Sequence, residues 1–115
     1  MSSHVDQELA LRARVLLAGS EPPTPWQAYR AHRLLAGDNP AVHLPKLALA
    51  AIELTGHYPV LLRRDLQLGL MAEALAVAAA IPADDPFRPE ALRQIRKAYA
   101  EQAVRLGIPP HPETI

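Results

Sequence analysis

The chain has 115 residues, half of them hydrophobic, with 18 Leu and 21 Ala but only five aromatic residues. Twelve basic residues balance twelve acidic ones, and there is no Cys. This balance disfavours a generic nucleic-acid binder, an acidic tail and a disordered chain, and the lack of thiols excludes disulfides, thiolate catalysis and Cys-ligated zinc. The Leu- and Ala-rich composition favours helix over strand, in one domain.

Residues that start and stop helices divide the chain into five predicted helices. Thr24-Pro25-Trp26-Gln27 is a capping box, with Thr24 at the N-cap and Gln27 three residues on. Pro45 either starts the third helix or kinks it. The predicted helices span about residues 4–18, 25–36, 41–55, 60–81 and 87–106.

Four glycines follow helix-like runs and are each followed by proline: Gly19, Gly37, Gly56 and Gly107. We expect them to end the helices in the left-handed conformation. The spacing of these stops gives about 37 residues for two helices and their turns, the size of one helical-hairpin repeat. The tetratricopeptide pattern itself fails, because Tyr29, Arg30 and Arg33 stand where that pattern needs other residues.

The sequence therefore predicts an all-α fold of about five antiparallel helices, in a compact bundle or a short TPR-like stack of helical hairpins. Residues 1–108 are expected to form a single domain, and residues 109–115 a proline-rich C-terminal tail.

The fourth predicted helix is apolar on every side. Between Leu66 and Ile81 its only charge is Glu73, and a helix of this kind is normally buried at the centre of a bundle. Part of the third helix would then stay exposed as an apolar patch, and such patches mark interfaces. The predicted partner-binding residues are three from the third helix and three aromatic residues beside it: Leu47, Ala51, Leu54, Trp26, Tyr29 and Tyr58.

Positive charge gathers near the start of the last predicted helix, in a basic patch formed by Arg88, Arg93, Arg96 and Lys97. The patch suggests a nucleic-acid site or an acidic partner, whereas a solvated helix face is the ordinary explanation. A DNA-binding or transcription-regulatory protein that uses this helix is the alternative function. Nucleic-acid binding is disfavoured, because Glu90 and Glu101 dilute the charge.

Evidence for chemistry at a site is weak. Glu53 and His57 stand four residues apart, as a helical metal pair would, and carboxylate plus imidazole suits zinc or iron. Surface histidines near helix ends explain the pair equally well. Further candidate ligands on nearby segments are His32, Asp38 and His43. A small helical metal-binding protein or enzyme subunit is thus a second alternative, but no catalytic residue, metal or cofactor is assigned.

Taken together, these patterns favour a non-enzymatic protein–protein interaction module, such as an adaptor, small chaperone, antitoxin-like partner or assembly subunit. It would act as a homodimer or with one protein partner. Without a targeting segment or a membrane span in the sequence, we expect a soluble cytoplasmic protein. Arg far outnumbers Lys, which is typical of a GC-rich bacterial genome.

Overall fold

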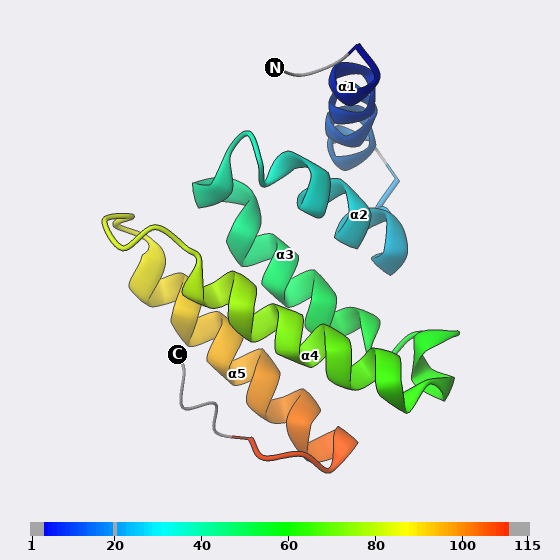
Figure 1. The fold of residues 1–115 in the computed structure, drawn as a ribbon, viewed down its shortest axis with the longest axis vertical. Coiled ribbons are helices and arrows are strands. Elements are labelled where there is room, and N and C mark those ends of the chain that lie inside the picture. The colour runs from blue at the N-terminus through cyan, green and yellow to red at the C-terminus, as the bar shows by residue number, and fades with distance from the viewer. Residues whose placement is uncertain (1–3, 20, 111–115) are drawn as a thin grey trace.

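Five α-helices and one short 3₁₀ turn make up the described part of the chain, which comprises residues 4–19 and 21–110 of a computed structural model (Figure 1). They are α1 (His4–Ala18), α2 (Pro25–Leu35), α3 (Pro40–Leu54), η1 (Val60–Leu62), α4 (Arg64–Ala79) and α5 (Arg88–Leu106). These residues contain no strand, so the predicted all-α fold is confirmed. The end of the predicted tail, residues 111–115, lies outside the described residues.

The predicted start of α2 is confirmed in detail. The Thr24 hydroxyl accepts a hydrogen bond from the Gln27 backbone N–H at 3.2 Å. In return, the Gln27 side-chain oxygen accepts one from the Thr24 N–H at 3.0 Å. Two N–H groups that the helix leaves without partners are satisfied in this way. α3 begins at Pro40 and continues through Pro45, so Pro45 does not start the helix.

The glycine stops behave differently from our expectation. Among the described glycines only Gly107, with φ of 71°, is left-handed. The prediction is therefore wrong for Gly19, Gly37 and Gly56. Right-handed turns close these helices instead: after α2, for example, the N–H groups of Asp38 and Asn39 both donate to the Leu35 carbonyl. Such turn hydrogen bonds satisfy the last carbonyls of a helix without a left-handed residue.

The predicted helix over residues 60–81 is interrupted near its start. η1 ends at Leu62, and Arg63 then adopts an extended conformation, with φ of −123° and ψ of 96°, at the N-cap of α4. The Arg63 guanidinium folds onto Asp65, with Nη2 to Oδ2 at 2.8 Å. Because its extended backbone cannot continue a helical ladder, the long helix begins only at Arg64.

The centre of the fold is α3, which packs against α2, α4 and α5. Its residues Leu47, Ala51 and Leu54 are at most 4% exposed. Our predictions that α4 takes the centre and that these three residues stay exposed are therefore wrong. On α4, Leu66 and Leu68 remain about two-fifths exposed. Over its length α3 is more apolar than α4, which begins with Arg64 and Asp65 and also carries Glu73, so burying α3 removes more apolar surface from water.

The interior consists of two separate apolar clusters. The larger one joins α3, α4 and α5 with Tyr29 of α2. Its tightest contacts involve fully buried alanines: Ala48, Ala51, Ala74, Ala78 and Ala103. The smaller cluster holds α1 against α2 through Ala10, Ala13, Ala31 and Leu35. α1 packs mainly on α2 and stands apart from α4 and α5 (Figure 1).

Three buried polar side chains lie at the end of the large cluster where α3 finishes. Gln102 on α5 donates to the Thr55 hydroxyl at 2.9 Å, and Gln67 on α4 donates to the Thr55 carbonyl at 3.0 Å. The Thr55 hydroxyl itself donates to the Ile52 carbonyl. These bonds tie the ends of α3, α4 and α5 together where the backbone turns away from α3.

A membrane-spanning helix would need to be longer and more apolar than any helix among residues 4–19 and 21–110.

Candidate functional site

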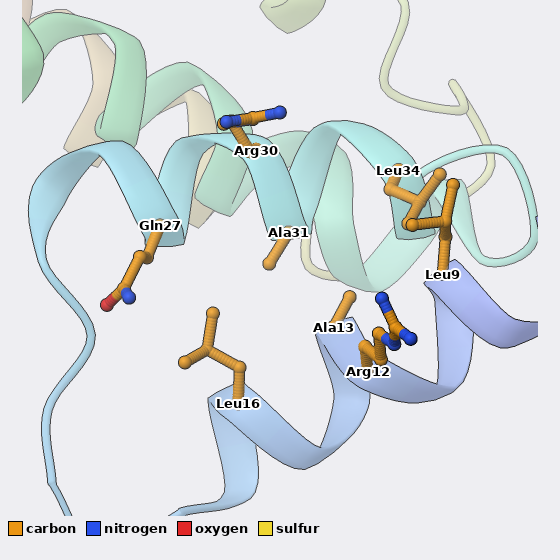
Figure 2. A pocket seen from close by; sticks show the side chains of 8 residues that line it. All are labelled: Leu9, Arg12, Ala13, Leu16, Gln27, Arg30, Ala31 and Leu34. Carbon is orange, nitrogen blue, oxygen red and sulfur yellow. The ribbon is translucent and has the colours of Figure 1, made fainter.

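An apolar groove runs between α1 and α2, with a volume of about 370 Å³. It is lined by eight residues: Leu9, Arg12, Ala13, Leu16, Gln27, Arg30, Ala31 and Leu34. Figure 2 shows the side chains of Leu9, Ala13 and Leu16 rising from α1 toward Ala31 and Leu34 of α2. The groove follows directly from the helical hairpin formed by the first two helices.

The floor and the walls of the groove differ in burial. Ala13 and Ala31 form the floor and are only 7% and 4% exposed, because their small side chains let the two helices meet. Leu9 and Leu34 form the walls and are 40% and 38% exposed. These branched apolar side chains line the hollow without filling it. When a partner covers them, they leave water, and their burial favours binding.

Two arginines give the groove its charge. Arg12 binds Glu8 of the same helix, with Nη2 to Oε1 at 2.7 Å, and both side chains are exposed. Arg30 lies on the edge of the groove, on the upper side of α2 in Figure 2. The groove therefore joins an apolar floor to a polar rim, the arrangement typical of binding surfaces.

The outer face of α1 is also apolar. Leu11 is 59% exposed and Val15 is 64% exposed. They stand four residues apart, so they lie next to each other on the helix. With the groove on one flank and these residues on another, α1 exposes much of its apolar surface although it is folded against α2.

The predicted aromatic rim is only partly a surface feature. Tyr29 is 5% exposed, and its hydroxyl donates to the Glu73 carboxylate, with Oη to Oε2 at 2.7 Å. Arg33 donates to the same hydroxyl at 2.7 Å. Burial and then the Glu73 hydrogen bond raise the pKa of Tyr29. Tyr29 thus fastens α2 to α4, and Glu73, the one charge of the apolar fourth segment, is its acceptor.

The other two predicted aromatic residues are exposed. Trp26 stands edge-on to Tyr29, with ring centroids 6.1 Å apart and an interplanar angle of 85°, and is 39% exposed. It follows the N-cap of α2, next to the groove residue Gln27. Tyr58 is 76% exposed and lies in the turn after α3. A partner-binding role for Trp26 and Tyr58 stays a prediction.

The basic patch on α5 is partly occupied by internal contacts. Arg93 donates to Glu90 through Nε at 2.9 Å. Arg88 donates to the Ile81 carbonyl at 3.3 Å. Arg96 and Lys97 are exposed. Glu90 neutralises part of the patch, and the alternative of DNA binding stays a prediction that salt-dependent retention on DNA would test.

The candidate metal ligands lie in two places. Glu53 and His57 are close together, with Oε1 to Nε2 at 3.8 Å, and both side chains are about half exposed or more. His32 and His43 meet elsewhere, with their Nδ1 atoms 3.1 Å apart. Asp38 binds Arg14 instead of joining either pair. Within the described residues, no three His, Cys, Asp or Glu side chains gather as a metal ion would require.

In the sequence, Leu9, Ala13 and Leu16 form one apolar stripe on the first helix, which is the pattern of a face that neighbouring helices cover, and so no groove was predicted there. One signal was present: Leu11 and Val15 lie outside that apolar stripe. A helix with apolar residues on several sides but only one neighbour leaves some of them uncovered.

The chain matches no protein-family model, no curated protein and no solved structure.

Proposed function

We propose that the chain is a non-enzymatic protein–protein interaction module, and that it associates as a homodimer through the α1–α2 groove. The observation that carries this proposal is the incomplete burial of the groove walls, with Leu9 and Leu34 about two-fifths exposed above a floor of buried alanines. Apolar side chains that stay exposed along a groove between two helices are typical of interfaces.

A second copy is the occupant that the charges and helix lengths favour. α1 has 15 residues, so it is about 22 Å long and offers about four turns for contact with an antiparallel copy. In that arrangement Glu8 of one copy faces Arg12 of the other, which makes the surface complementary to itself. Two helical hairpins joined in this way form a four-helix bundle. A net charge of zero removes the repulsion between copies.

The first test is light scattering at micromolar concentration, where we expect the mass of a dimer. Leu9→Glu and Leu34→Glu each place a charge in the groove wall and should give monomers that remain helical, because both positions are already partly exposed. Val104→Glu is the matched control: Val104 is 70% exposed on α5 and far from the groove in sequence, so its dimer should persist. A monomeric wild type, or a dimer that survives both groove substitutions, contradicts the proposal.

A second test uses the absence of Cys from the chain. In a one-to-one mixture of Glu8→Cys and Arg12→Cys chains, the two thiols face each other across the proposed dimer and should form a disulfide-linked heterodimer under mild oxidation. Lys97→Cys, on the exposed side of α5, should remain monomeric on a non-reducing gel. Equal cross-linking of the mixture and of Lys97→Cys would indicate random collision and not the proposed interface.

A further inference from the structure

A second hollow, of about 480 Å³, opens where α1, α2 and the first turns of α3 meet. Its lining consists of Arg14, Leu17, Ala18, Pro23, His32, Leu35, His43 and Lys46. Every ionisable side chain in this lining either carries a positive charge or gains one on protonation. Asp38 is the acidic group nearby, and it binds Arg14 with Oδ2 to Nη2 at 3.2 Å. The proposed dimer does not use this hollow.

The two histidines form one unit. Their Nδ1 atoms are 3.1 Å apart and their ring centroids 5.3 Å apart. A neutral imidazole has one N–H and one lone pair, so one ring donates through Nδ1 and the other accepts. The donor ring then keeps a lone pair on Nε2, while the acceptor ring has an Nε2–H. A single proton added to the pair leaves the Nδ1–Nδ1 bond intact and makes both Nε2 atoms donors.

The surroundings of the pair favour negative charge. Burial, then the charges of His43 and Lys46, lower the pKa of His32 to about 4. Burial, then Lys46 and Arg14, lower the pKa of His43. The empty pair is therefore neutral at pH 7, although two permanent positive charges stand beside it. An anion placed there gains from those charges and stabilises protonation of the pair.

A metal ion does not suit this hollow. Arg14 and Lys46 repel a cation, and the pair supplies only two imidazole ligands where transition metals in proteins take three or more. The same groups suit phosphate, because guanidinium, ammonium and imidazole donors are those that bind it in proteins.

We propose that this hollow binds a small phosphate monoester, with the phosphate held by Arg14, Lys46 and the histidine pair and a compact apolar body against Leu17 and Pro23. Arg14 and Lys46 together match the charge of about −1.5 to −2 that a phosphate monoester has at pH 7. The body is required because the hollow is much larger than one phosphate group, and the partly exposed side chains of Leu17 and Pro23 give it an apolar wall.

The test is an NMR titration of the full chain with phenyl phosphate at pH 7, following the imidazole signals. We expect saturable binding and a rise in the pKa of His32. Lys46→Gln should weaken binding about tenfold, because it removes a charge-assisted hydrogen bond. Asp38→Asn should tighten binding about threefold, because it frees Arg14 from its ion pair. Arg96→Gln, on the exposed side of α5, is the matched control and should bind as the wild type does.

The Asp38→Asn variant protects the test against a folding artefact, since damage to the fold weakens binding and does not tighten it. Two comparisons sharpen the ligand class. Benzoate carries one charge and should bind more weakly than phenyl phosphate, and inorganic phosphate lacks the apolar body and should also bind more weakly. The proposal is overturned if phenyl phosphate gives no saturable shift, if Asp38→Asn binds no better than the wild type, or if benzoate or inorganic phosphate binds as tightly.

Discussion

The molecule has a body, formed by α3, α4 and α5, and an end, formed by α1 and α2. Both regions contain the same types of apolar residue, but the body buries them and the end leaves several of them exposed. In the body, α3 is covered by three helices, and Leu54, Met71 and Ile95 are at most 1% exposed. At the end, α1 packs mainly on one helix, and Leu9 and Leu11 stay 40% and 59% exposed. The comparison indicates which part of the molecule holds the fold together and which part leaves apolar surface available to a partner, because a helix with a single neighbour must leave apolar surface uncovered.

The largest expected effect compares one buried leucine from each region. Leu54→Ala should lower the free energy of unfolding by about 4–5 kcal/mol, because the rigid body cannot collapse around the cavity. Leu35→Ala, 1% exposed in the small cluster, should lower it by about 2–3 kcal/mol, because α1 can shift to fill the space. Urea denaturation measures both. Equal losses would show that the α1–α2 end is as rigid as the body.

A smaller effect is expected from the polar group that closes the body. Gln67→Met keeps the side-chain length but removes the donor to the Thr55 carbonyl. A buried carbonyl without its partner should lower the free energy of unfolding by about 1–3 kcal/mol. Urea denaturation again measures the loss, and Gln7→Met, at an exposed position of α1, provides a comparison at the other end. A loss below the error of the measurement would mean that water replaces Gln67.

The free energy of unfolding should depend on pH through His32, which lies at the α1–α2 end. Its pKa falls from 6.5 to about 4 on folding, so the unfolded chain binds more protons between those values. The contribution of His32 to the free energy of unfolding is therefore fully present above pH 6.5 and decreases as the pH falls toward 4. From about pH 7 to about pH 5 we expect a loss of about 1–2 kcal/mol from this group.

His32→Gln should reduce the pH dependence of the unfolding midpoint in that range, whereas His57→Gln, at an exposed position, should not. If the unfolding midpoint changes equally with pH in the wild type and in both variants, then His32 titrates normally. The charged groups facing His32 in this comparison are His43, Lys46 and Arg14, with Asp38 paired to the last.

The smallest effect concerns the basic patch. Glu90→Gln removes the ion pair with Arg93, in which both side chains are more than half exposed. Solvent screens such pairs strongly, so the unfolding midpoint should not change measurably. The same variant frees Arg93, and tighter salt-dependent retention on DNA would favour the alternative function of α5.

Local sequence signals predicted the helices well, because capping and periodicity act within one turn. The Thr24 capping box is an example. Which helix becomes central is a property of the whole chain. Between Leu66 and Ala79 α4 carries only one charge, at Glu73, yet Leu66 and Leu68 are about two-fifths exposed. The contact between Tyr29 and Glu73 joins residues 44 positions apart, and no local pattern announces it.

The same limit applies to the candidate sites. Glu53 and His57 are near each other in sequence and were paired correctly, while His32 and His43 meet only because the turn after α2 reverses the chain. The groove depends on how α1 is left uncovered. It could be recognised only once the neighbours of α1 were known.

The alanines buried between α3, α4 and α5 set a limit on how this protein can change. Ala48, Ala51, Ala74 and Ala78 are fully buried, so a longer side chain at any of them has to displace its neighbours. At these positions the damaging replacements are the larger hydrophobic ones that ordinarily strengthen an interior. Homologous sequences that keep this arrangement should therefore keep a side chain of alanine size at these positions.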